Sequence, residues 1–207
     1  MFEGKLRGRS KAILAPVVSG IGALGISANM LTLFGLVVNV IAGIALATGC
    51  SVIAGVLILF GGSFDMIDGA VARASAKKNS SGALLDSVID RYSESVVFLG
   101  AMIYFFQRGN LLGIVLVFTS AIGSILVSYV RARAEGLEIQ CKVGLMQRPE
   151  RIILLAVGAL AQGLVSRYSL WGSNGVILMG VFAVLAITSH ITAVHRLAFG
   201  FSELKNR

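Results

Sequence analysis

Six long apolar stretches run along this chain and restrict the folds that it can adopt. They lie at about residues 29–48, 52–72, 83–106, 111–133, 150–166 and 174–195. Each approaches the roughly 20 apolar residues that an α-helix needs to cross a bilayer. A chain of 207 residues with 56% hydrophobic and 14% charged residues is also too apolar for a soluble domain. The sequence therefore predicts an all-α integral membrane protein, a single domain over 1–207 with a bundle of six transmembrane helices at about 29–195.

The first nineteen residues differ from the apolar stretches because they mix basic and apolar side chains. The basic residues are Lys5, Arg7, Arg9 and Lys11. This mixture predicts an amphipathic interfacial helix over 1–19, with its basic residues toward anionic headgroups. The alternative is a basic N-terminus that only sets the topology. No short apolar region with a cleavage site follows, so we expect no cleavable signal peptide.

The distribution of charge predicts the orientation in the membrane. An even number of spans puts both termini and the loops at 73–82 and 134–149 on one side. That side carries all ten acidic residues and all eighteen Lys and Arg residues except Arg108 and Arg167. The positive-inside rule then predicts a multi-pass protein of the cell membrane with both termini in the cytoplasm. We assign the net charge of +8 to contact with membrane lipids and not with nucleic acid.

Four aspartates flank the loop at 73–82. Asp65 and Asp68 are three residues apart and Asp86 and Asp90 are four apart, so each pair lies on one face of a helix and the pairs can face each other. Ionised carboxylates in an apolar helical setting are costly unless a cation compensates them. Oxygen ligands without nearby His or Cys favour Mg²⁺, Mn²⁺ or Ca²⁺ over zinc. The alternative is a set of helix-end acids bound only to water and neighbouring Arg and Lys.

The residues around these aspartates resemble the signature of the CDP-alcohol phosphatidyltransferases. The matching positions are Asp65, Asp68, Gly69, Ala72, Arg73, Gly82, Asp86 and Asp90. The resemblance implies an enzyme that depends on Mg²⁺ or Mn²⁺, with two ions bridging the phosphates of a CDP-linked lipid such as CDP-diacylglycerol. It also implies a homodimer. The positive-inside rule places the aspartates, and with them the active site, on the cytoplasmic side.

The resemblance further assigns roles to single residues. Asp65, Asp68 and Asp86 are implied to be the main metal ligands. Asp90 is implied to be the general base and a possible fourth ligand. The residues implied to bind the CDP-lipid are Asn29, Thr32, Asp68, Gly69, Ala72, Arg73 and Gly82.

Elementary chemistry is compatible with these roles at three of the positions. Gly69 and Gly82 let a phosphate or ribose approach the backbone. The guanidinium of Arg73 offers a planar fork to a diphosphate oxygen. Asn29 and Thr32 remain open, since a helix cap and an interhelical hydrogen bond explain them equally well.

A second group of residues predicts the acceptor. It consists of the arginines Arg131, Arg133, Arg148, Arg151 and Arg196, all near the predicted cytoplasmic boundary. Several guanidiniums converging on one pocket are costly without an anion, so we expect a phosphorylated acceptor. Alternatively, these arginines satisfy the positive-inside rule, bind lipid headgroups or pair with nearby glutamates. The segments at 128–135 and 148–151 resemble the branch of the family that uses inositol 1-phosphate, although Arg131 stands where many members have Lys.

We therefore predict transfer of a phosphatidyl group from a CDP-activated lipid to inositol 1-phosphate, which releases CMP and forms phosphatidylinositol phosphate. The expected partners are the CDP-lipid, a small phosphorylated polyol and membrane lipids. One alternative is the same chemistry with glycerol 3-phosphate, and another is a different lipid such as CDP-archaeol. A cation transporter would need acids spread through the bilayer, and a lipid-binding scaffold would not need all four aspartates.

Overall fold

The computed structural model of the chain describes residues 26–74, 80–168 and 174–205. The predicted interfacial helix at 1–19 lies outside the described residues. The helices are α2 (Ala28–Ala47), α3 (Ser51–Ala74), α4 (Ser80–Phe106), α5 (Leu111–Glu135), α6 (Arg148–Tyr168) and α7 (Val176–Lys205). Each coincides with one of the six predicted apolar stretches. The prediction of an all-helical membrane protein is therefore confirmed.

The lengths of the helices reflect the polar residues at their ends. Five of the described helices are long and apolar enough to cross a membrane. α4 is not among these five, because its first half carries the charged residues Asp86, Asp90, Arg91 and Glu94. Helices α3, α4 and α5 extend a few residues beyond their apolar stretches. α7 continues to Lys205, well past the predicted end at 195, because the prediction marked only its apolar part.

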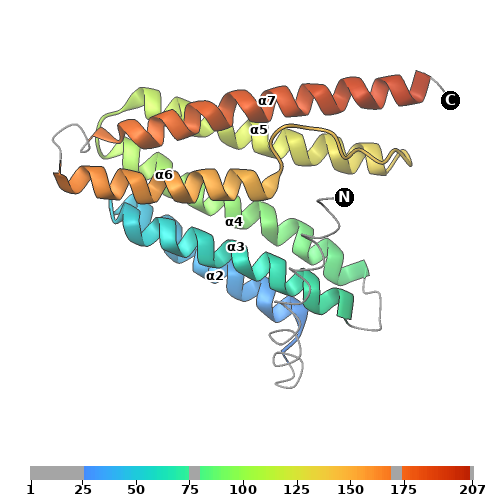
Figure 1. Cartoon of the computed structure of the whole chain (residues 1–207), viewed down its shortest axis with the longest axis horizontal. Coiled ribbons are helices and arrows are strands. Elements are labelled where there is room, and N and C mark those ends of the chain that lie inside the picture. The colour runs from blue at the N-terminus through green and yellow to red at the C-terminus, as the bar shows by residue number, and fades with distance from the viewer. Residues whose placement is uncertain (1–25, 75–79, 169–173, 206–207) are drawn as a thin grey trace, which may run out of the picture.

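The helices alternate in direction and form one bundle (Figure 1). α2 and α3 lie on one side and α5 and α7 on the other, with α4 and α6 between them. α2 packs against α3 and α4, and α6 connects the two sides through contacts with α3 and α7. A Cβ atom at Gly100 of α4 would collide with the carbonyl oxygen of Gly43 in α2. The two backbones therefore pack directly against each other.

One buried side chain joins the start of α7 to α6. The carboxamide oxygen of Gln162 accepts hydrogen bonds from the backbone N–H groups of Ile177 and Leu178, at 3.1 and 3.3 Å. Gln162 is fully buried. It thereby satisfies amide groups that the first turn of a helix leaves without intrahelical partners.

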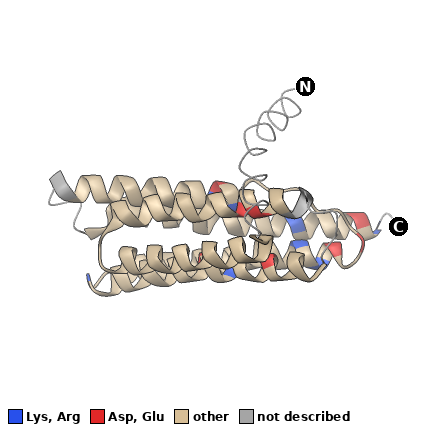
Figure 2. Ribbon diagram, turned by 90° about the horizontal axis from the view of Figure 1, so that it is seen from below, with Lys and Arg blue, Asp and Glu red and all other residues tan. Residues whose placement is uncertain are grey.

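The charged side chains gather toward the end of the bundle that holds the C-terminus (Figure 2). This end includes the C-terminal parts of α3, α5 and α7 and the beginnings of α2, α4 and α6. The opposite half contains most of the large core, including Leu46, Phe105 and Phe182. The polar end of the bundle is thus the place where a site for charged ligands can form.

Candidate active site

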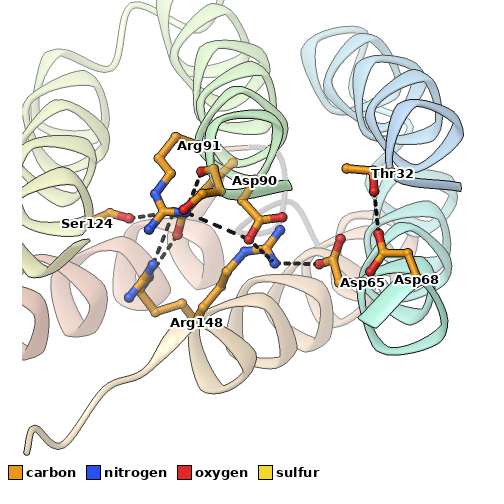
Figure 3. Close-up of polar contacts among 10 residues, drawn as sticks. Thr32, Asp65, Asp68, Asp90, Arg91, Ser124 and Arg148 are labelled. Atoms are coloured by element: carbon orange, nitrogen blue, oxygen red, sulfur yellow. Dashed lines mark hydrogen bonds and ion pairs between the residues drawn. The ribbon is translucent and has the colours of Figure 1, made fainter. Parts of the chain in front are cut away.

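The end of α3 and the beginning of α4 bring the aspartate pairs toward each other. Arg148, the first residue of α6, lies between them (Figure 3). Its Nη1 atom is 2.8 Å from Oδ2 of Asp65 and 2.8 Å from Oδ2 of Asp90. The guanidinium of Arg148 therefore bridges a carboxylate of α3, that of Asp65, and a carboxylate of α4, that of Asp90.

Asp68 has a different partner, on α2. The Thr32 hydroxyl donates to Oδ2 of Asp68 at 2.8 Å, and Asp68 is only 3% exposed. Thr32 thus makes the interhelical hydrogen bond that was the alternative to a nucleotide contact. Ser27 caps α2, because its side chain accepts a hydrogen bond from the backbone N–H of Met30. Asn29 lies half-buried in the first turn of α2.

The aspartates offer oxygen ligands but are not arranged around a common point. Among the described residues, no three His, Cys, Asp or Glu side chains lie close enough together to hold a metal ion. Two observations nevertheless fit a hard cation at this place. The buried Oδ1 atom of Asp90 has no hydrogen-bond partner in the described part of the chain, and a cation already bridges Asp65 and Asp90 in the form of Arg148. Asp65, Asp68, Asp86 and Asp90 could hold Mg²⁺ or Mn²⁺ once Arg148 has moved away.

A pocket of about 310 Å³ adjoins the aspartates. It is formed by α4, α5, α6 and α7 together with Gln147. The charged residues that line it are Asp86, Asp90, Arg91, Arg131, Glu135, Arg148, Arg151 and Arg196. Four of the five arginines predicted to bind the acceptor therefore line one pocket with two of the four aspartates. Arg133 is exposed and does not line this pocket.

Two of these arginines differ in how firmly they are held. Arg196 is buried and donates from Nε to the carbonyl oxygen of Val143 and from Nη1 to that of Val127, both at 2.8 Å. Arg131 is half-exposed and pairs with Glu135 at 2.8 Å, which is one of the pairings considered from the sequence. Arg196 is fixed by the fold, whereas Arg131 lies at the rim of the pocket.

The remaining residues predicted to bind the CDP-lipid lie near the loop between α3 and α4. Gly69 follows Asp68 within α3, and Gly82 lies in the first turn of α4. Ala72 and Arg73 belong to the last turns of α3, but their side chains are outside the described part of the structure.

The sequence reasoning missed Glu94. Its carboxylate accepts from Nε and Nη2 of Arg151, at 2.8 and 3.2 Å, and from the hydroxyl of Ser124. The sequence spacing did indicate that Glu94 belongs near the site, because Glu94 follows Asp90 by four residues and therefore shares its helix face. An acidic residue at that place in an apolar helix needs a partner.

This geometry can be compared with known proteins. The family described as CDP-alcohol phosphatidyltransferase matches residues 25–197. The archaetidylinositol phosphate synthase of Methanothermobacter thermautotrophicus is 32% identical over 182 residues, which cover 88% of this chain and 87% of the relative. The phosphatidylinositol phosphate synthase of Mycobacteroides abscessus is 35% identical over 153 residues, which cover 73% of this chain and 70% of that protein.

Solved structures share the fold. The crystal structure of phosphatidylinositol phosphate synthase (PgsA1) of Mycobacterium tuberculosis with CDP-DAG bound has a TM-score of 0.77 and 28% sequence identity, and the match covers 92% of this chain and 94% of that one. The same enzyme in complex with manganese and citrate has a TM-score of 0.76 at 28% identity, over 91% of this chain and 88% of that one. The matched residues include all four aspartates and all of the pocket. This chain belongs to the CDP-alcohol phosphatidyltransferase family.

Proposed function

We propose that this protein transfers the phosphatidyl group of a CDP-linked lipid to inositol 1-phosphate and releases CMP. One observation carries the proposal. Two of the signature aspartates and five arginines, four of them predicted to bind the acceptor, line a single pocket of about 310 Å³. A pocket in which carboxylates adjoin guanidiniums suits an acceptor that must lose a proton at one end and be held by a phosphate at the other.

The proposed reaction is a substitution at the phosphorus that is attached to the lipid. The acceptor hydroxyl oxygen forms a bond to that phosphorus, and the bond from phosphorus to the bridging diphosphate oxygen breaks. CMP leaves with the bridging oxygen. Asp90 takes the hydroxyl proton as general base, since its Oδ1 atom has no partner among the described residues.

We assign the binding of Mg²⁺ or Mn²⁺, as two ions, to Asp65, Asp68, Asp86 and Asp90. The manganese complex of the mycobacterial enzyme supports this assignment. Bound metal ions would stabilise the charge that develops on the attacking and leaving oxygens. Asn29, Thr32, Gly69, Ala72, Arg73 and Gly82 are the residues that we assign to the CDP-lipid.

The acceptor phosphate would contact Arg148, Arg151 and Arg196, with Arg131 at the rim. Inositol 1-phosphate is favoured over glycerol 3-phosphate because curated relatives are named archaetidylinositol and phosphatidylinositol phosphate synthases. The same names leave two candidates for the CDP-linked lipid, a diacyl lipid and an archaeal ether lipid.

We further propose a cell-membrane location with the pocket facing the cytoplasm, because the charged residues gather at one end of the bundle (Figure 2). Homodimerisation stays a prediction.

The test is CMP release by the purified protein with Mg²⁺ or Mn²⁺. CDP-diacylglycerol and CDP-archaeol are each combined with inositol 1-phosphate, glycerol 3-phosphate, free inositol or serine. We expect release only with inositol 1-phosphate. A preference for glycerol 3-phosphate would refute the acceptor and keep the reaction, and release with free inositol at the same KM would refute a role for the arginines in binding phosphate.

A further inference from the structure

Glu94 and Arg151 form a buried ion pair that the proposed chemistry does not use. Nε and Nη2 of Arg151 donate to the two carboxylate oxygens of Glu94. The side chains are 3% exposed for Arg151 and 13% for Glu94. Ser124 of α5 donates a further hydrogen bond to the same carboxylate. Helices α4, α5 and α6 are therefore joined at one acidic group beside the pocket.

This pairing restricts the guanidinium of Arg151. The two bonds use the edge that carries Nε and Nη2, and Nη1 takes part in neither. The same side chain lines the pocket of about 310 Å³. A planar guanidinium that is held along one edge presents its other end in a fixed direction. Glu94 therefore determines how Arg151 meets a ligand in the pocket.

The pairing is one of two that connect α4 with α6. Asp90 and Glu94 are one turn apart on α4, and Arg148 and Arg151 are one turn apart on α6. The two helices are thus connected by two successive ion pairs, Arg148 with Asp90 and Arg151 with Glu94. A buried arginine that loses its carboxylate is strongly disfavoured. Without Glu94, the guanidinium of Arg151 loses the contact that holds one of its edges, and it no longer presents its other end to the pocket in a fixed direction.

We propose that Glu94 is a positioning residue that sets the affinity of the pocket for the phosphate of the acceptor, acting through Arg151. The inference rests on the proposed function, because it assumes that the acceptor phosphate enters this pocket. Glu94 itself touches no substrate. It orients the arginine that does.

The experiment compares Glu94→Ala with Glu94→Asp and with Glu203→Ala. Glu203 is the control for loss of an acidic side chain, since it is exposed near the end of α7 and does not line the pocket. We expect Glu94→Ala to raise the KM for inositol 1-phosphate about tenfold, the size of one lost hydrogen bond between charged groups. The kcat and the KM for CDP-diacylglycerol should change less than about twofold, because Asp90 keeps its own ion pair with Arg148. Glu94→Asp should recover most of the affinity because it keeps the carboxylate.

Three results would overturn the inference. The first is an acceptor KM that is unchanged in Glu94→Ala. The second is an acceptor KM that falls in this variant, which would mean that Glu94 only reduces the positive charge of the pocket. The third is a loss of kcat and of thermal stability with no change in the acceptor KM, which would indicate a purely structural role. If the alanine variant does not fold, Glu94→Gln keeps the length of the side chain and is measured in the same way, with the same rise expected.

Inorganic phosphate separates this inference from the proposed function. Phosphate should raise the unfolding temperature of the wild-type protein and of Glu203→Ala more than that of Glu94→Ala. Wild-type protein that releases no CMP, yet shows this difference, would refute the proposed function and support the role of Glu94. Wild-type protein that releases CMP, with equal phosphate stabilisation in Glu94→Ala, would refute the role of Glu94 alone.

Discussion

Replacing Arg148 by glutamine should increase the affinity of the protein for Mn²⁺. The guanidinium of Arg148 bridges Asp65 and Asp90, the carboxylates that we assign to metal binding. A metal ion that binds these oxygens must displace the guanidinium, so the ion pairs oppose metal binding. Glutamine removes the positive charge and keeps much of the side-chain volume.

The size of the effect follows from the exposure of the groups. The side chains are 24% exposed for Arg148, 22% for Asp65 and 12% for Asp90, so each pair is partly screened by solvent. Two such pairs contribute together about 0.5–2 kcal/mol. That range corresponds to an increase of about 2- to 30-fold in Mn²⁺ affinity. Turnover should fall at the same time, because Arg148 also lines the pocket that we assign to the acceptor.

The assay is a titration of the purified protein with Mn²⁺ in the absence of substrates, with free Mn²⁺ followed by its electron paramagnetic resonance signal. Arg148→Lys should bind Mn²⁺ nearly as the wild type does, since it keeps the charge. Arg91→Gln is the matched control, because Arg91 lies 3.9 Å from the same Oδ2 atom of Asp90 and is more exposed. Weaker Mn²⁺ binding in Arg148→Gln would refute the reasoning and would mean that Arg148 holds the carboxylates in place for the metal.

Three further changes test other parts of the structure. Asp90→Asn should retain binding of the CDP-lipid and lower kcat by about 10²–10⁴-fold, as expected for loss of a general base, and near-normal CMP release would exclude that role. Gly100→Leu should destabilise the packing of α4 on α2 by about 1–3 kcal/mol, whereas Gly180→Leu, which has open space around its Cβ position, should leave the thermal unfolding temperature unchanged. Arg131→Ala should raise the KM for the acceptor and Arg133→Ala should not, and equal effects would contradict the assignment of the pocket.

The fold could be predicted because the length of an apolar stretch is a local property of the sequence. Each stretch had to become a helix, since the bilayer leaves no other way to satisfy its backbone groups. The common helix face within each aspartate pair was also predictable, because it follows from the spacings of three and four residues. Arg133 could have been excluded by the same rule, since it lies two residues after Arg131 and points to another face of α5.

The contacts between helices could not be predicted in this way. The rotation of each helix about its axis depends on the packing of all six, and it decides which long side chain reaches which acid. Nothing in the spacing indicated that Arg148 would bridge Asp65 and Asp90, or that Thr32 would bind Asp68. Glu94 was missed for a related reason, because its importance comes from Arg151, which lies on another helix.

The hydrogen bonds that Gln162 makes to the start of α7 also bear on how the protein inserts into a membrane. The amide groups of Ile177 and Leu178 find their acceptor on α6 and not within α7. In a lipid environment, a carboxamide or an amide that lacks its partner is costly. The last two helices are therefore most stable when they enter the bilayer together as a hairpin.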